Sequence, residues 1–344
     1  MSKEPGKLNM LPVRYFSAEE RELFLDTAER CGFPVEEERK IPYRERGVHL
    51  YFVHLKNRVI EPIYQVMIGA CMASGGSRFY HVDEFCRLAE LDFSAEPRYP
   101  VFHIPHDGYD RPAELMRSVC ISEDDFDYYD AVMSDVGISG FIPRAHYTGS
   151  NVVRFDVCRI LCDVERFIGP QEVMEQYGMG FCYERAYDGT KIKHVTDELR
   201  KKTLVYYNEH HARMDRLCDR HERILLFDLH SYHDEIVPAA FLQPGRKTPD
   251  LCIGADDRFT PPALMEILRR RFEEAGFSVA VNDPYSGTFV PNAVLSGASE
   301  CDLVSVMLEF HKRTYCDEYF SPIEEKQNAI RAVLQKVLAD CAAL

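Results

Sequence analysis

Histidine, acidic and arginine side chains recur in this chain where short apolar runs end. They are His106, Arg159, Asp163, Arg166, His230 and Glu309. A hydrolytic zinc site uses these groups as N and O ligands, as a general base and as a clamp for negative charge. In an open α/β sheet, ligands bind beyond the carboxyl ends of the strands, so these side chains could meet there. One such residue alone is more often structural, and the prediction of a site depends on their joint occurrence.

Apolar strands alternate with amphipathic helices from residue 101 onward. The strands are expected in the runs VFHIPHDG, RILCDVERF, RILLFDLHS, SVAVNDPYSG and LVSVMLEFHKR. The helices are expected in DELRKKTLVYYNEHHARMDRLCDRH and ALMEILRRRFEEAG. This alternation predicts an α/β fold with a mixed, largely parallel sheet and helices on both faces. We expect a small accessory α+β region in residues 1–97. Residues 98–344 are expected to form the α/β domain, with a C-terminal helix that begins at Pro322.

The composition of the 344 residues indicates a globular protein with a reduced interior. The 12 cysteines are scattered and form no CxxC pair, which favours a cytoplasmic location. The N-terminal segment does not predict a signal peptide, and no apolar run reaches the ~18 residues of a membrane span. A formal net charge of −15 opposes binding to nucleic acid. We therefore expect a small-molecule substrate, no nucleic-acid or membrane partner, and a chain that could form a homo-oligomer.

Residues 101–316 resemble the N-formylglutamate amidohydrolases, zinc hydrolases similar in fold to the zinc carboxypeptidases. Eight segments follow in family order: IPHDG, SDVGISGFI, RILCDVERF, MGFCYERAYDGT, FDLHS, PDLCIGADD, NDPYSGTF and MLEFHKRTYCDE. IPHDG is similar to the family's PH[SA]G, FDLHS to its DxHS, and RILCDVERF to its RYVVDLNRP. The resemblance implies a phosphorylase/hydrolase-like α/β fold and hydrolysis of an amide bond.

The resemblance also implies one zinc ion per chain, which iron or manganese could replace. Its ligands carry over to His106 of the PHxG motif, to His230 of the DxHS motif and to an acidic residue. Asp135 fits the family register for that acid, while Asp107 and Asp110 are rivals because they lie near His106 in the sequence. Two imidazoles, one carboxylate and a water would leave zinc an open position for a carbonyl.

Two further carboxyl groups have roles in this hypothesis. Asp228 lies two residues before His230 on the same strand face, so it could orient the His230 ring. Glu309 takes the position of the carboxypeptidase-like catalytic Glu, where it would accept a proton from the attacking water and pass it to the leaving amine. The alternatives are a turn-capping Asp228 and an ion-paired Glu309 at a strand end.

Arginine side chains would bind the negative charge of the substrate and of the reaction. Arg159 would stabilise the oxyanion, and Arg166 would bind the substrate. Asp163 lies between them and would support the site without binding the metal; a structural ion pair with Asp163 is the alternative for one arginine. The substrate would also contact a pocket rim consisting of Asn282, Tyr285 and Gly287.

The sequence departs from the family pattern in two places. Glu165 precedes Arg166 where the family has Asn, and a carboxylate there opposes binding of another carboxylate unless it is paired. The segment after Asp135 lacks the histidine and second acid of the family. Both changes argue against N-formylglutamate itself. We predict an amidohydrolase for a small N-acyl (formyl-like) amino acid or a related compound; the alternatives are a carboxypeptidase-like peptidase or deacylase, and a non-catalytic binding protein.

Overall fold

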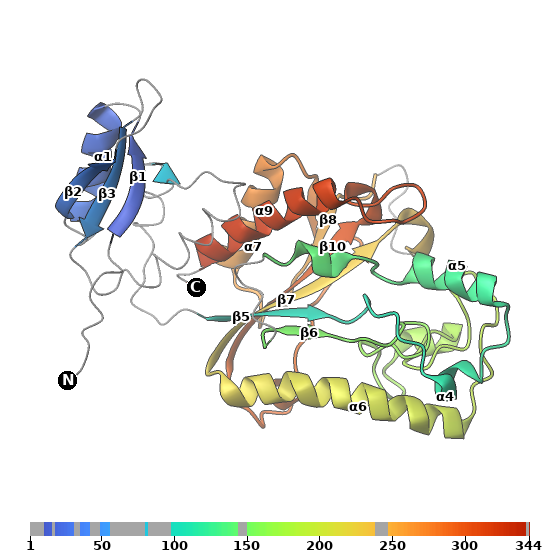
Figure 1. The fold of residues 1–344 in the computed structure, drawn as a ribbon. Coiled ribbons are helices and arrows are strands. Elements are labelled where there is room, and N and C mark those ends of the chain that lie inside the picture. Colours follow the sequence, from blue (N-terminus) through green and yellow to red (C-terminus); the bar gives the residue numbers. More distant parts are fainter. Residues whose placement is uncertain are drawn as a thin grey trace. The chain divides into compact units, whose positions relative to one another are not determined.

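The computed structural model describes residues 10–15, 18–30, 35–41, 49–55, 80–81, 98–143, 150–237, 247–341 and 344. The chain divides into two compact units (Figure 1). One consists of Met1–Arg98, Pro143–His146 and Ala332–Leu344, and the other of Tyr99–Ile142 and Tyr147–Arg331. The expected boundary at residue 97 falls at the end of a stretch outside the described residues. The division into residues 1–97 and 98–344 therefore stays a prediction.

Strands and one helix make up the described N-terminal part of the first unit. They are β1 (Met10–Tyr15), α1 (Ala18–Arg30), β2 (Val35–Ile41), β3 (His49–Leu55) and β4 (Tyr80–His81). In the described residues the strands form one sheet in the order β2-β3-β1-β4. Pairing of β3 with β1 and β2 is antiparallel, and β1 pairs with β4 in parallel. This mixture of strands and a helix is an α+β arrangement.

A second sheet forms the centre of the other unit. Its strands, within the described residues, are β5 (Tyr99–Ile104), β6 (Val152–Arg154), β7 (Arg223–Tyr232), β8 (Leu251–Gly254), β9 (Val279–Val281) and β10 (Asp302–His311). They lie in the order β6-β5-β7-β10-β8-β9. The first four strands are parallel, β8 is antiparallel to β10, and β9 is parallel to β8. The predicted mixed, largely parallel α/β sheet is confirmed.

Helices cover both faces of this sheet, with α6 along one face and α7 on the other (Figure 1). Leu217 of α6 packs in one core cluster with Ile224 and Leu226 of β7. On the other face, the ring of Phe272 in α7 lies 5.5 Å from that of Phe310 in β10. The helix bounds are α4 Ala113–Met116, α5 Glu123–Met133, α6 Asp197–Arg220, α7 Pro262–Glu274, α8 Asn292–Leu295 and α9 Glu324–Asp340.

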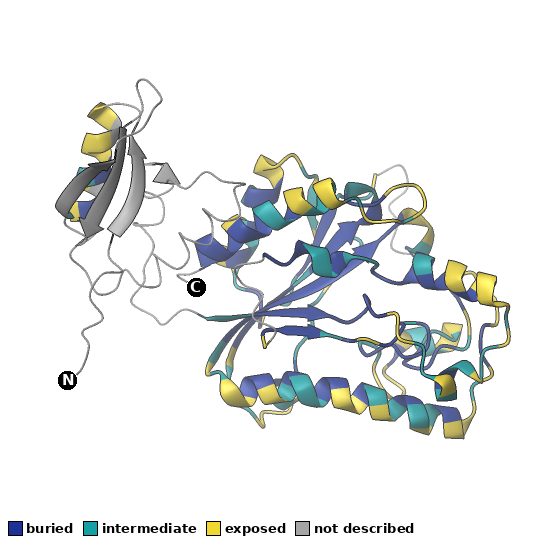
Figure 2. Ribbon diagram, viewed as in Figure 1, coloured by how far each residue is buried: buried dark blue, intermediate teal, exposed yellow. Residues whose placement is uncertain are grey.

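Burial follows the alternation of apolar and polar residues. Figure 2 shows the central strands buried and α6 exposed along its outer side. The short 3-10 helices, which connect these elements, are η1 Ile138–Phe141, η3 Val173–Tyr177, η4 Asp234–Ile236 and η5 Lys312–Thr314. Among the described residues, no helix has the length and apolarity that crossing a membrane requires.

The segment RILCDVERF is not the strand that its apolar residues predicted. The amide groups of Leu161 and Cys162 donate to the carbonyl of Cys158 at 3.0 and 3.2 Å, which closes a turn. The apolar side chains of residues 160–164 are buried in a core cluster that also contains residues of α5 and α6. A turn whose side chains are buried on several sides has a run of apolar residues, as a buried strand does. The two cannot be distinguished by the apolar run alone.

The direction of β9 corrects a second expectation. Because β8 is antiparallel to β10 and β9 is parallel to β8, β9 runs opposite to β5, β7 and β10. Asn282 follows β9 and therefore does not lie at the edge where those three strands end. Sequence alone placed all the strand ends together, since an apolar run carries no sign of its direction.

Gly108 allows the chain after β5 to pass close to the chain after β6. A Cβ atom at this position would lie 2.4 Å from the carbonyl oxygen of Phe155 and 2.4 Å from the carbonyl carbon of Asp156. The neighbouring amide of Asp110 donates to the carbonyl of Asp156 at 2.8 Å. Glycine at this place in the IPHDG motif thus holds the segment after His106 against β6.

We expect Gly108→Ala to lower the free energy of unfolding by about 1–3 kcal/mol, because backbone atoms cannot rotate away from the added methyl group. Chemical denaturation of the full chain measures the change. Val205→Ala, at an exposed position of α6, is the control and should stay within about 0.5 kcal/mol of the parent. Equal stabilities of the two variants would contradict the close approach at residue 108.

Candidate functional site

The structure brings together the three residues predicted to bind metal. His106 follows β5, and His230 lies near the end of the parallel strand β7. The Oδ2 atom of Asp135 lies 3.3 Å from Nδ1 of His106 and 3.2 Å from Nδ1 of His230. All three side chains are buried. Their meeting at the carboxyl ends of parallel strands agrees with the place where α/β sheets bind ligands.

Backbone contacts fix the position of Asp135. Its amide donates to the carbonyl of His106 at 2.8 Å. The carboxylate of Asp107 accepts backbone N–H groups of the segment 137–139 at 2.7 and 3.0 Å, which holds this segment beside His106. Asp110 is exposed and forms a backbone bridge with residue 157. Asp107 is therefore occupied in holding the segment that follows Asp135, and Asp110 is exposed.

Glu165 is a second acid beside the two histidines. Its Oε2 atom lies 3.1 Å from Nε2 of His230 and 3.8 Å from Nε2 of His106. Asp135 therefore faces the Nδ1 edges of both rings, and Glu165 faces their Nε2 edges. His106, Glu165 and His230 form one of the groupings whose ligand atoms are close enough to share an ion. The sequence analysis missed this role because it considered Glu165 only as a neighbour of Arg166.

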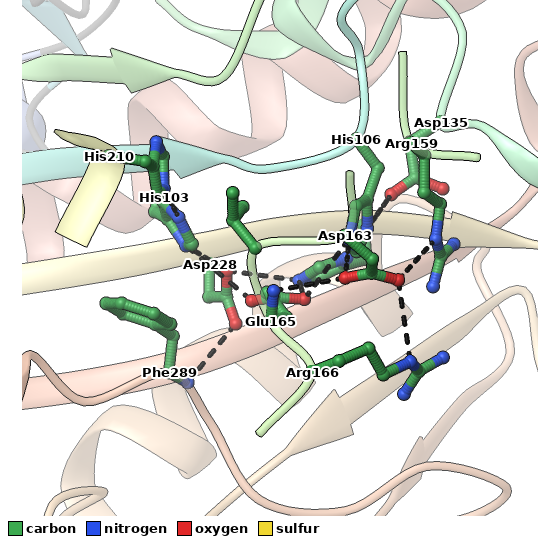
Figure 3. Close-up of polar contacts among 12 residues, drawn as sticks. His103, His106, Asp135, Arg159, Asp163, Glu165, Arg166, His210, Asp228 and Phe289 are labelled. Carbon is green, nitrogen blue, oxygen red and sulfur yellow. Dashed lines mark hydrogen bonds and ion pairs between the residues drawn. The ribbon is translucent and has the colours of Figure 1, made fainter. Parts of the chain in front are cut away.

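Asp163 joins several parts of the site (Figure 3). Its Oδ2 atom accepts hydrogen bonds from Nε of Arg159 at 3.0 Å and from the hydroxyl of Tyr183 at 2.7 Å. Its Oδ1 atom accepts from the amide of Glu165 at 3.0 Å and lies 3.0 Å from Nε2 of His106. Burial alone would raise the pKa of Asp163, but the neighbouring positive groups hold the pKa well below its usual value.

Both Arg159 and Arg166 form an ion pair with Asp163, whereas the sequence analysis considered such a pair for only one of them. Arg159 also donates from Nη1 to the carbonyl of Met133 at 2.9 Å, and its side chain is 15% exposed. Arg166 lies farther away, with Nε 3.4 Å from Oδ2 of Asp163, and its side chain is 25% exposed. Arg159 is thus fixed in place, whereas Arg166 is the guanidinium better able to turn toward a substrate.

The electrostatics of the site favour an added positive charge. Burial and Arg159 act to lower the pKa of His106, yet Asp163 and Asp135 outweigh them and raise it. The pKa of His230 is also raised well above its usual value, because Glu165 and Asp228 outweigh burial. Carboxylates thus draw protons onto both imidazoles.

Each of the two predicted histidine ligands also has a buried ring nitrogen without a hydrogen bond. These nitrogens are Nδ1 of His106 and Nε2 of His230. Nitrogen atoms without partners among several carboxylates are the donor set of a divalent cation such as zinc. The residues therefore fit the metal that the family resemblance implies.

Asp228 lies next to His230, whose ring it was expected to orient, and it also contacts a second histidine, His103. Its Oδ1 atom lies 3.0 Å from Nε2 of His230 and 2.8 Å from Nδ1 of His103. Its Oδ2 atom accepts from the amide of Phe289 at 3.2 Å. Nε2 of His103 lies 2.8 Å from Nε2 of His210 in α6. His103 lies in β5, three residues before His106. This short separation in the sequence was the signal that His103 could lie near the site.

Glu309 lies on the same face of the sheet as His230, because the two residues are directly paired in the parallel strands β10 and β7. Its side chain is buried, and its Oε2 atom has no hydrogen bond. Burial raises the pKa of Glu309 to about 7, with His230 opposing and Asp135 adding to the shift. A carboxyl group with this pKa can both take up and release a proton near neutral pH.

The predicted pocket rim is only partly near these groups. Asn282 is exposed, and its side-chain oxygen accepts from the amide of Ala255 at 2.8 Å, which gives it a structural contact. Tyr285 packs its ring 5.6 Å from that of Tyr232, and burial followed by the charge of Glu309 raises its pKa. Gly287 has a positive φ of 85°. Of the three predicted rim residues, Tyr285 is therefore the one that is close enough to be influenced by the charge of Glu309.

Comparison with known proteins agrees with this architecture. A family model described as N-formylglutamate amidohydrolase matches residues 100–316, more than half of the chain. The crystal structure of an N-formylglutamate amidohydrolase from Ralstonia eutropha JMP134 matches with a TM-score of 0.57 and 18% sequence identity. The match covers 72% of this chain and 94% of that one, and at this identity it shows a shared fold. None of the curated proteins matches the sequence.

We expect Asp163→Asn to lower the free energy of unfolding by about 3–5 kcal/mol, because it leaves buried guanidinium charge without compensation. Asp156→Asn is the matched control, since Asp156 pairs with Arg154 at 2.8 Å on the surface, where such a pair contributes about 0–1 kcal/mol. Urea denaturation of both variants measures the difference. Similar losses in the two variants would show that Asp163 is not the buried centre of this network.

Proposed function

The chain belongs to the N-formylglutamate amidohydrolase family, and we propose that it is a zinc-dependent enzyme that cleaves the amide bond of a small N-acyl amino acid or a related compound. Family and fold indicate a hydrolase that acts on amide bonds; the metal and the substrate are inferences from the site. One observation carries them: His106 and His230 meet buried carboxylates in a cluster whose charge favours a cation.

The two imidazoles would hold the metal with one carboxylate. Asp135 is the acid expected from the sequence, and it would act at the Nδ1 edges of the rings. Glu165 is its rival at the Nε2 edges. Zinc suits two nitrogens, one carboxylate oxygen and an open position, although iron or manganese could use the same donors. When bound, the ion would act as a Lewis acid that polarises the substrate carbonyl.

Glu309 would move the proton. Its buried carboxylate lies on the strand next to His230 and faces the same side of the sheet. With a pKa raised to about 7 by burial, it would accept a proton from the attacking water and donate it to the leaving amine. Such positioned acid–base catalysis contributes about 10²–10⁴-fold to a rate.

The arginines would bind negative charge in two different ways. Arg159 is held by Asp163 and by a backbone carbonyl, so it would present a fixed charge to the oxyanion that forms at the amide carbonyl. Arg166 is more exposed and more loosely paired, which suits it to a carboxylate or another acceptor group of the substrate. Tyr285 would line the same side of the pocket.

We expect the purified full-length chain, dialysed against zinc, to bind at least about one ion per chain, because structural and catalytic zinc sites bind far below micromolar concentrations. His230→Ala should abolish most of this binding, since it removes a ring nitrogen that faces the carboxylates. Elemental analysis after dialysis measures the content.

His233→Ala is the matched control for this experiment. His233 lies three residues further along the chain, and its ring packs against Phe320 with the centroids 4.8 Å apart. It should leave the zinc content unchanged. A parent protein that holds less than about 0.2 zinc per chain after zinc addition would remove the basis of the proposed function.

We expect kcat/KM on a panel of N-acyl amino acids to rise with pH through an acid limb that reports Glu309. The base works in its ionised form, so activity is lost as the pH falls through its pKa. That pKa is about 7 without a bound cation, and a nearby cation stabilises the carboxylate, so the midpoint should lie at or below about 7.

Glu309→Gln should remove this limb and lower kcat/KM at least about 100-fold, while elemental analysis finds the zinc content unchanged. The unchanged metal content separates loss of the base from loss of the site. A variant that keeps both its zinc and its full turnover would exclude Glu309 from the reaction.

A further inference from the structure

A second grouping of possible ligands adjoins the first one and contains His103. Its members are His103, Glu165 and Asp228, and their ligand atoms all lie within 4.8 Å of one another. Nδ1 of His103 lies 2.8 Å from Oδ1 of Asp228 and 3.7 Å from Oε1 of Glu165. Ligands about 2.0–2.1 Å from one tetrahedral ion are roughly 3.3–3.5 Å apart. The observed separations lie on either side of that value.

Glu165 belongs to both groupings and turns a different oxygen toward each. Its Oε2 atom faces Nε2 of His230 at 3.1 Å and Nε2 of His106 at 3.8 Å. Its Oε1 atom faces Nδ1 of His103 at 3.7 Å. Figure 3 shows the carboxylate between His103 on one side and His106 on the other. A carboxylate with one oxygen toward each of two ligand sets is placed to bridge two ions, which in two-metal sites are about 3.5–4 Å apart.

The ring nitrogen Nε2 of His230 faces carboxylate oxygens that belong to both groupings. It lies 3.0 Å from Oδ1 of Asp228 and 3.1 Å from Oε2 of Glu165. The side chain is 4% exposed, yet Nε2 makes a hydrogen bond with neither oxygen. Buried ring nitrogens normally have a hydrogen-bond partner. Here one ring nitrogen and two carboxylate oxygens lie close together without hydrogen-bond geometry. Such an arrangement is expected of ligands that surround a metal ion.

The charge of the cluster also allows more than one ion. Its five carboxyl groups belong to Asp135, Asp163, Glu165, Asp228 and Glu309. When all are ionised, the guanidinium groups of Arg159 and Arg166 leave an excess of three negative charges. One divalent ion would neutralise two of them. The first ion would leave one negative charge and a second would leave one positive charge, so the charge of the cluster is compatible with either number of ions.

His210 provides the support that a metal-binding His103 needs. A ligating histidine usually donates its other ring N–H to a nearby acceptor, which fixes its tautomer. Nε2 of His103 lies 2.8 Å from Nε2 of His210. A proton on Nε2 of His103 would be donated to Nε2 of His210 at this distance. In that tautomer His103 would present an unprotonated Nδ1 toward Asp228 and Glu165, in place of the hydrogen bond that Nδ1 forms with Oδ1 of Asp228 at 2.8 Å.

We propose that the site binds two divalent ions, one held by His106 and His230 and the other by His103 and Asp228, with Glu165 bridging them. This inference rests on the proposed function, because it adds a second ion to the metal site assigned there. Asp135 then serves to orient the two imidazoles from their Nδ1 edges. The second ion gives Glu165 a role that the asparagine of the family pattern, which carries no charge, would not have.

Manganese is the probe for the test, because its binding can be counted and its magnetic coupling can be observed. The full-length protein is stripped with a chelator, dialysed against Mn²⁺ and analysed for metal content and by electron paramagnetic resonance. We expect about two ions per chain and the signal of an exchange-coupled Mn²⁺ pair. His103→Phe should bind about one ion and give the signal of an isolated Mn²⁺. Glu165→Gln should lose the coupled signal.

His233→Phe is the matched control, since it changes a buried histidine outside both groupings; it should keep two coupled ions. One ion per chain in the parent would overturn this inference and leave the proposed function intact. No bound metal would overturn both. Two coupled ions in His103→Phe would exclude His103 as a ligand. Should that variant fail to fold, Glu165→Gln decides, because its side chain is 18% exposed and a retained coupled signal would exclude the bridge.

Discussion

The carboxylate of Asp163 is fully buried, and a charge removed from water persists only with partners that compensate for it. Those partners are Arg159, Arg166, Tyr183 and the ring of His106. Compensation of one charge therefore fixes the position of the Arg159 guanidinium and of one imidazole, and it keeps the Arg166 guanidinium nearby. It also places Glu165, because the backbone amide of that residue donates to the same carboxylate.

The same requirement explains why residues 159–167 do not form a strand. Side chains alternate between the faces of a strand, so Arg159 and Asp163 would share a face and Arg166 would lie on the other. A turn lets both arginines reach one carboxylate. The apolar residues of the segment correctly predicted that it is buried. They wrongly predicted that its backbone forms a strand. The spacing of the three charged residues held the information that would have corrected it.

More of the site than of its connecting segments could be predicted from the sequence. His106, His230 and Glu309 follow or close parallel strands, and parallel strands bring their carboxyl ends to one edge whatever the details of packing. Asp135 reaches the same place through a segment held by Asp107. Asn282 does not, since an apolar run does not show that β9 runs in the opposite direction. Sequence spacing gives the face on which a histidine lies, but not which ring edge faces which acid.

The role expected of Glu165 differs most between the sequence and the structure. Beside Arg166 in the sequence, its charge is expected to repel a substrate carboxylate. In the folded chain its oxygens face the rings of His230 and His103, so a proton on His230 or a bound metal ion would compensate its charge. The field that it presents to a ligand at Arg166 is correspondingly weaker. The like-charge argument against an anionic substrate loses its force under these conditions.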